Sequence, residues 1–178
     1  MEVVEHEFPA PIYIDGRAGR GKTFCLYPII GALRKDGHIV LLSASSAFAA
    51  KLYPGGQTAH YLYGIPVDEH SPYLESSLRH GRSGRAQLLL AARCHVIDEI
   101  GGLHFKAFDC ADRLMRSLCN EHHHVWGGRL LITLGDFRQV FYFTFCEIGS
   151  YSFTGSTSRA IWWEARNCSS ITQNSEGV

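Results

Sequence analysis

The stretch Gly16-Arg17-Ala18-Gly19-Arg20-Gly21-Lys22-Thr23 decides the fold that this chain is expected to adopt. Its pattern, GxxxxGK[ST], places glycines where the backbone turns tightly and exposes successive N–H groups to phosphate oxygens. An apolar run precedes it at 11–15 and a helical pattern follows at 23–35, although Pro28 should kink that helix or remove a bond near its start. Strand, glycine-rich loop and helix predict a P-loop for a nucleoside triphosphate and Mg²⁺, rather than a glycine turn without a ligand.

Three more apolar runs, at 39–43, 94–98 and 129–134, have no polar alternation, which is typical of strands covered on both faces in a parallel sheet. Residues 106–119 carry apolar side chains at helical spacing, and a shorter helix is expected around 86–92, after a surface loop at 64–85. This alternation predicts an α/β domain with a parallel sheet flanked by helices, whose ligands lie beyond the carboxyl ends of the strands.

The composition is that of one ordinary globular domain. Of 178 residues, 46% are hydrophobic, and 17 basic side chains balance 17 acidic ones. Neutrality gives no global field that would attract a polyanion, so any nucleic-acid contact must rest on a local patch. Because no signal peptide and no apolar run of about 20 residues is visible, we expect a soluble, intracellular protein. The six cysteines form no CxxC pair, and we expect no disulfides.

Two further motifs follow predicted strands. Asp98-Glu99 ends the run at 94–98, where an Asp can hold Mg²⁺ and a neighbouring Glu can polarise the attacking water. The segment 135–139 reads GDFRQ, and Gln139 at its end can hydrogen-bond a γ-phosphate. Taken alone, the first motif is more often a strand end that meets solvent, and the second could be a polar turn.

These motifs, in this order, resemble the PIF-like DNA helicases of superfamily 1, including the helicase parts of Helitron transposons. The P-loop, the Asp-Glu strand end and the sequence GDFRQV carry the resemblance, together with Ser43–Ala50, similar to motif Ia, and Pro54–His60, similar to a "GG-x-TAH" segment. It runs from about residue 13 to residue 139 and faintly on to 172–174.

The resemblance implies a RecA-like P-loop NTPase fold and an ATP-dependent 5′-to-3′ DNA helicase acting on single-stranded or forked DNA in repair, recombination and telomere maintenance. For a eukaryotic chain it implies the nucleus. Lys22, Glu99 and Gln139 would be catalytic, Thr23 and Asp98 would hold Mg²⁺, and residues 16–23 would bind ATP. The residues implied along the DNA are Ser45, Ser46, Phe48, Thr58 and His60.

Structural alternatives stay open for several of these residues. Ser45 and Ser46 could cap the helix that follows, Phe48 could be core, and His60 is ambiguous. The run 122–124, three consecutive histidines, invites a zinc interpretation with Cys119, but adjacent residues point in different directions, so a solvated turn is preferred.

The chain departs from the family pattern towards its end. It stops at Val178, so we expect one RecA-like domain over 1–178, with the second motor domain missing and a divergent segment at 140–178. There, Asn174-Ser175-Glu176 replaces the family's Asn-x-Arg. We therefore expect a truncated helicase with weak or no unwinding of its own. The alternatives are a silent nucleotide- or DNA-binding remnant of a transposon helicase and, less consistent with the motifs, a small-molecule kinase.

Overall fold

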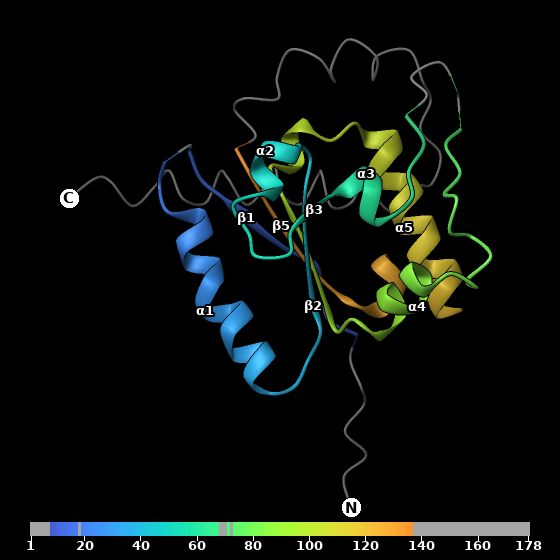
Figure 1. Ribbon diagram of the computed structural model, residues 1–178, viewed down its shortest axis with the longest axis horizontal. Coiled ribbons are helices and arrows are strands. Elements are labelled where there is room, and N and C mark those ends of the chain that lie inside the picture. The colour runs from blue at the N-terminus through green and yellow to red at the C-terminus, as the bar shows by residue number, and fades with distance from the viewer. Residues whose placement is uncertain (1–7, 18, 68–70, 72, 137–178) are drawn as a thin grey trace, which may run out of the picture.

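The computed structural model describes residues 8–17, 19–67, 71 and 73–136, and a five-stranded parallel sheet lies at the centre of this part (Figure 1). The strand order is β1-β5-β4-β2-β3, and neighbouring strands all run parallel. The strands are β1 (Ile12–Asp15), β2 (Val40–Ala44), β3 (Gln57–Thr58), β4 (Cys94–Asp98) and β5 (Leu130–Gly135). The predicted α/β class with a parallel sheet is confirmed.

The register of the sheet brings the ends of four segments to one edge. Asp15 pairs with Gly135 between β1 and β5, and Ala44 pairs with Asp98 between β2 and β4. Since all strands are parallel, their carboxyl ends and the loops that follow lie at this same edge. The P-loop, the Asp-Glu pair and the turn after β5 are therefore neighbours in space although they are far apart in the sequence.

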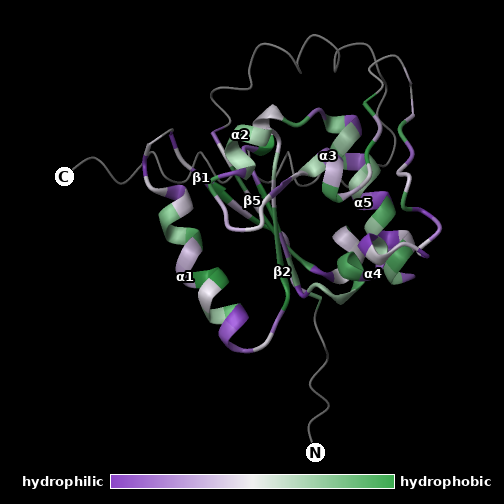
Figure 2. Cartoon of the chain, in the orientation of Figure 1, coloured by the Kyte–Doolittle hydropathy of each residue, from purple (hydrophilic) through white to green (hydrophobic). Residues whose placement is uncertain are grey.

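Helices cover both faces of the sheet, with α1 on one side and α3, α4 and α5 on the other (Figure 1). Figure 2 shows the strands as hydrophobic segments between helices that mix hydrophobic and hydrophilic residues. The helices are α1 (Lys22–Lys35), α2 (Ala47–Ala50), α3 (Ala59–Leu62), α4 (Gly84–Ala91) and α5 (Phe105–Cys119), with 3₁₀ helices η1 (Ile100–Gly102) and η2 (Val125–Gly128).

Alternate residues of the strands build two cores, because successive side chains point to opposite faces. Val96 and Ile132 pack with Leu26 and Ile30 of α1, whereas Ile97 and Leu131 pack in the core under α5. This explains why the strands lack polar alternation: β4 is buried at every position. β1 is half-exposed at the sheet edge, where among the described residues it pairs only with β5.

The core under α5 contains an aromatic cluster built around His95. The Tyr63 hydroxyl lies 3.2 Å from His95 Nδ1, and the Trp126 ring packs edge-on against Tyr63 at a centroid distance of 5.3 Å. Burial lowers the pKa of His95 to about 3, so this imidazole is neutral at ordinary pH. His95 is a structural residue of the core.

The predicted elements agree with the observed ones to within one or two residues at their ends. α4 begins at Gly84 and ends at Ala91 rather than spanning 86–92, because Ser83 accepts a hydrogen bond from Ala86 N and caps it. α1 continues through Pro28 as one helix, so this proline does not end it. The two-residue strand β3 was not predicted, and its brevity gave no periodic pattern to detect.

Candidate nucleotide-binding site

The described part of the P-loop has the backbone conformation that its glycines permit. Gly19 and Gly21 have φ values of 74° and 78°, in the left-handed region where residues with a Cβ are strained. Gly21 is the N-cap of α1. The backbone therefore turns directly into the helix, whose N-terminal N–H groups and positive dipole end form a cradle for an anion.

Lys22 lies folded against its own loop. Its Nζ donates to the carbonyl oxygen of Gly16 and, at 3.1 Å, to that of Arg17. A Cβ on Gly16 would lie 3.1 Å from Lys22 Cγ, so the glycine makes room for this side chain. Both acceptors are neutral carbonyls, and a phosphate oxygen in the pocket would be a stronger, charge-assisted partner for the ammonium group.

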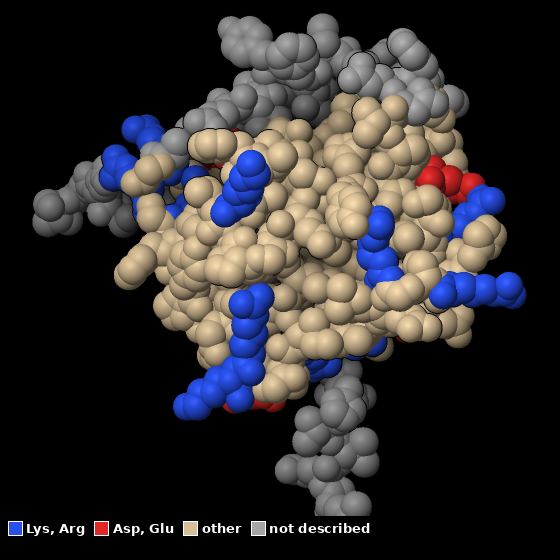
Figure 3. Space-filling view, viewed as in Figure 1, with Lys and Arg blue, Asp and Glu red and all other residues tan. Residues whose placement is uncertain are grey.

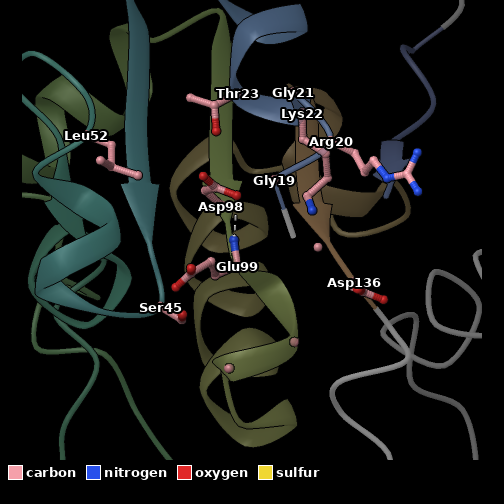
Figure 4. Close-up of a pocket in the computed structure, with 13 residues that line it drawn as sticks. Gly19, Arg20, Gly21, Lys22, Thr23, Ser45, Leu52, Asp98, Glu99 and Asp136 are labelled. Atoms are coloured by element: carbon pink, nitrogen blue, oxygen red, sulfur yellow. Dashed lines mark hydrogen bonds between the residues drawn. The ribbon is translucent and has the colours of Figure 1, made fainter. Parts of the chain in front are cut away.

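An open pocket of about 450 Å³ lies between the P-loop and the carboxyl ends of β4 and β5 (Figure 4). Its size is that of a small-molecule site. Figure 4 shows Lys22 and Arg20 on one side of it and Asp98 and Glu99 on the other. The lining residues are Gly19, Arg20, Gly21, Lys22, Thr23, Ser45, Leu52, Asp98, Glu99, Gly101, Gly102, Gly135 and Asp136.

The acidic pair after β4 is held by its own backbone and by a serine. Asp98 Oδ1 accepts a hydrogen bond from Glu99 N at 2.7 Å, and Ser46 Oγ donates to Glu99 Oε2 at 3.4 Å. Glu99 has φ 50° and ψ 42°, an uncommon left-handed conformation for a non-glycine residue. Such conformations persist where the surrounding structure holds them, and they cluster at functional sites.

Thr23 and Asp98 both line the pocket and face one another, with the Thr23 hydroxyl pointing toward the carboxylate (Figure 4). A hydroxyl and a carboxylate are the hard oxygen ligands that Mg²⁺ prefers, alongside phosphate oxygens and water. These two residues therefore fit the cation that accompanies a nucleoside triphosphate. Asp98 is only 5% exposed, so its charge lies in a protected position at the base of the pocket.

One residue that the sequence did not indicate also reaches this pair. The Tyr53 hydroxyl donates to Asp98 Oδ2 at 2.6 Å, and the Thr23 side chain lies close to this hydroxyl. Burial raises the pKa of Tyr53 well above its ordinary value, and the hydrogen bond to Asp98 acts in the same direction. The tyrosine is therefore a protonated donor at any ordinary pH.

Two other contributions to the pocket were also missed. Gly101 and Gly102 line it, and a Cβ on Gly102 would approach Ser45 Oγ to 2.8 Å. Neither these glycines nor Tyr53 belongs to a motif with a known spacing, and both contacts join segments that are more than 40 residues apart. Only the folded chain reveals them.

The residues predicted to contact DNA lie in segment 45–60, which follows β2 and which we call the DNA-contact segment. Ser46 accepts a hydrogen bond from Ala49 N and caps α2, and Thr58 accepts one from Tyr61 N and caps α3. Ser45 caps no helix and lines the nucleotide pocket instead. Phe48 is 81% exposed, which excludes it from the core. His60 is half-buried, and this burial lowers its pKa.

Two of the predicted nucleotide-site residues, Ala18 and Gln139, lie outside the described residues, as does the divergent segment 140–178. Asp136 of the GDFRQ segment is described, and it lines the pocket. Of the eight P-loop residues, five line the pocket, and Gly16 and Arg17 contact it indirectly, through the Lys22 ammonium group.

The histidine run is exposed in a turn between α5 and η2, as preferred from the sequence. His124 Nδ1 lies 3.0 Å from Glu121 Oε1, and its ring stacks on Phe8. Within the described part of the chain, no group of three or more His, Cys, Asp or Glu side chains is placed to hold a metal ion. No helix of this part has the length and apolar character needed to cross a membrane.

Comparison with known proteins relates this geometry to a family. The PIF1-like helicase family matches residues 1–174. The ATP-dependent DNA helicase PIF4 of Trypanosoma brucei brucei is 32% identical over 142 residues, which are 76% of this chain and 17% of that protein. The ATP-dependent DNA helicase PIF1 of Homo sapiens is 33% identical over 129 residues, which are 72% of this chain and 19% of that protein.

A solved structure agrees with these relatives. The Pif1 helicase from Bacteroides, in complex with ADP-AlF3 and ssDNA, superposes with a TM-score of 0.61 at 27% sequence identity, covering 89% of this chain and 33% of that one. The RecA-like fold that the resemblance implied is thereby confirmed. This chain spans less than a fifth of the two curated helicases, 17% and 19% of their lengths. With its P-loop, its acidic strand end and the match over residues 1–174, the chain belongs to the PIF1-like helicase family.

Proposed function

We propose that this chain is the first motor domain of an ATP-dependent 5′-to-3′ DNA helicase and that its pocket binds Mg·ATP. The observation that carries the proposal is the convergence of the P-loop, Asp98-Glu99 and Gly135-Asp136 on one open pocket at the carboxyl edge of the sheet. These segments are about 35 to 115 residues apart in the sequence, and a nucleotide site explains why all three meet.

The residues of the pocket divide the work of binding and hydrolysis. Lys22 would exchange its two carbonyl partners for the β- and γ-phosphates, while Thr23 and Asp98 would hold Mg²⁺, directly or through water. The cation, when bound, neutralises charge that develops on the phosphates. Glu99, exposed at the pocket rim and restrained by Ser46, would orient the attacking water.

The proposal for DNA rests on the DNA-contact segment, with Phe48 as the exposed aromatic surface for a base. Figure 3 shows Lys and Arg side chains mostly standing singly on the face in view, so any contact with phosphates would be local. We propose single-stranded DNA as the partner, because the similar Bacteroides helicase is bound to it.

Nucleotide binding is tested with the Lys22→Ala variant and a fluorescent ATP analogue in the presence of Mg²⁺. Loss of a charge-assisted hydrogen bond costs about 1.5–3 kcal/mol, so we expect affinity to fall roughly 10- to 150-fold. Lys35→Ala is the matched control, because it removes the same charge from the opposite end of α1, about 20 Å away. Equal binding by wild type and Lys22→Ala would refute the nucleotide assignment.

Unwinding is a separate question. We propose that it requires a second RecA-like domain, whose closure on the nucleotide would couple hydrolysis to movement, so this chain alone should bind Mg·ATP and hydrolyse it slowly. A strand-displacement assay on a forked duplex addresses this. ATP-driven unwinding by the 178-residue chain alone would overturn the requirement for a second domain.

A further inference from the structure

Tyr53 is a buried side chain whose polar end reaches the candidate cation site. It follows α2, is only 3% exposed, and packs in the core beneath α1 with Leu26, Val96 and Leu134. Its hydroxyl nevertheless donates to Asp98 Oδ2 at 2.6 Å, close to the Thr23 side chain. Among the described residues, Tyr53 is thus the one tyrosine that reaches the two proposed Mg²⁺ ligands.

The simplest alternative is that Tyr53 only fills the core. A buried tyrosine does need a partner for its hydroxyl, and a backbone carbonyl often meets that need. The neighbouring Tyr27, which is 43% exposed, uses such a carbonyl: its hydroxyl donates to Leu52 O at 2.9 Å, and the two rings lie 6.1 Å apart. Tyr53 instead uses the carboxylate that faces the pocket, so its hydroxyl acts on the site itself.

The single proton of the Tyr53 hydroxyl determines which lone pairs Thr23 and Asp98 keep for a cation. The phenol has one proton, which it gives to Asp98, so its oxygen can only accept from the Thr23 hydroxyl beside it. With its proton turned to Tyr53, the Thr23 hydroxyl would present only lone pairs to the pocket, which is the form that a cation requires. Asp98 is held from two sides, by Tyr53 on Oδ2 and by Glu99 N on Oδ1, and each oxygen keeps a lone pair.

We propose that Tyr53 is a positioning residue for the Mg²⁺ site: its hydroxyl bridges Thr23 and Asp98 and fixes both in the orientation that binds the cation. The inference rests on the proposed nucleotide function, because the cation arrives with the nucleotide. Hydrogen bonds from behind a metal ligand restrict its orientation, and removing one typically costs about 10- to 100-fold in metal affinity. The residue touches neither substrate nor cation itself.

The experiment uses Tyr53→Phe, which removes only the phenol oxygen that contacts Asp98, and Tyr27→Phe, which removes the hydroxyl of the neighbouring ring without touching Asp98. Affinity for a fluorescent ADP analogue is measured in Mg²⁺ and in EDTA. We expect the factor by which Mg²⁺ raises the affinity for the ADP analogue to fall roughly 10- to 100-fold in Tyr53→Phe and to persist in Tyr27→Phe. Binding in EDTA should be unchanged in both variants. Titration with Mn²⁺, followed by electron paramagnetic resonance, reports cation binding independently of nucleotide fluorescence.

The outcomes separate this inference from the function on which it rests. No nucleotide binding by the wild type would overturn both. If Mg²⁺ raises the affinity of Tyr53→Phe for the ADP analogue as much as it raises that of the wild type, the positioning role is overturned and the nucleotide site still stands. If Tyr53→Phe loses the same ADP affinity in Mg²⁺ and in EDTA, the residue has a merely structural role. If Tyr53→Phe binds ADP more tightly in Mg²⁺ than the wild type does, the hydroxyl competes with the cation; either of these two results would also overturn the inference. Circular dichroism confirms that both variants are folded.

Discussion

The nucleotide pocket and the DNA-contact segment lie side by side at the carboxyl edge of the sheet, yet their polar side chains are used differently. In the pocket, Lys22, Asp98 and Glu99 line the open space; Lys22 is held by its own loop, and the two acidic side chains are also held by Tyr53 and Ser46. In the DNA-contact segment, Ser46 and Thr58 are already committed to helix N-termini. Polar side chains thus line the proposed binding site in one region and cap helices in the other.

The difference teaches which residues can carry the two parts of the proposed function. A helix-capping hydroxyl accepts the backbone N–H through a lone pair and is held in position by it. The proton of the Ser46 hydroxyl is directed at Glu99, so Ser46 does not also donate to a phosphate oxygen. The second region offers exposed aromatic surface for DNA in Phe48, with His60 half-buried nearby in the sequence. We therefore expect base stacking rather than hydroxyl contacts to dominate binding there.

The largest effect that would sharpen this comparison is expected for Phe48→Ala. Stacking of one base on an aromatic ring contributes about 1–3 kcal/mol, so affinity for single-stranded DNA should fall roughly 5- to 150-fold. Because Phe48 is 81% exposed, the free energy of unfolding should hardly change. Fluorescence anisotropy of a labelled oligonucleotide measures the first quantity, and urea denaturation measures the second.

Phe24→Ala is the matched control, because Phe24 is 77% exposed on α1, outside the DNA-contact segment. It should leave DNA affinity unchanged. If the two variants lose affinity equally, DNA binding is a general property of exposed aromatic surface, and the assignment of the segment fails.

The sequence predicted the elements that repeat a simple pattern. The strands β2, β4 and β5 were recognisable because burial on both faces leaves mostly apolar positions and no polar alternation. The P-loop was recognisable because its spacing is a direct consequence of how a backbone wraps phosphate. The parallel sheet is confirmed, and so is the family. The roles assigned to single residues stay predictions.

What the sequence missed depends on contacts between distant segments. Tyr53 and Asp98 are 45 positions apart, and nothing in the local sequence around Tyr53 marks its hydroxyl as a partner of the acidic motif. The left-handed backbone of Glu99 is likewise set by the packing around it, since a glutamate has no intrinsic preference for that conformation. For Ser46, the sequence allowed both a cap and a DNA contact, and the fold shows the cap.

A smaller effect is expected from removing the two caps. Ser46→Ala and Thr58→Ala should each lower the free energy of unfolding by about 1 kcal/mol, because each leaves a helix N–H without its partner. Affinity for single-stranded DNA, compared at equal folded fractions, should not change. Ser45→Ala, in the same segment but not at a cap, serves as the control for stability. A loss of DNA affinity without a loss of stability would reverse the interpretation and make these hydroxyls DNA contacts.

The smallest effect concerns His60 and appears only in acid. Burial lowers the pKa of His60 below its ordinary value of 6.5, so the imidazole is neutral at pH 7.5 and gains charge only as the pH falls below about 6.5. Wild type and His60→Gln should therefore bind single-stranded DNA equally at pH 7.5. At pH 5.5 the wild type should bind more tightly, with a salt dependence steeper by at most about 0.7, the value for one phosphate contact.

Because the other nine histidines are common to both proteins, the difference between the two profiles isolates His60. An advantage of the wild type that is already present at pH 7.5 would contradict a charge-based contact. It would mean that the neutral ring itself contacts a base, and the DNA-contact segment would then offer two stacking surfaces, Phe48 and His60, instead of one.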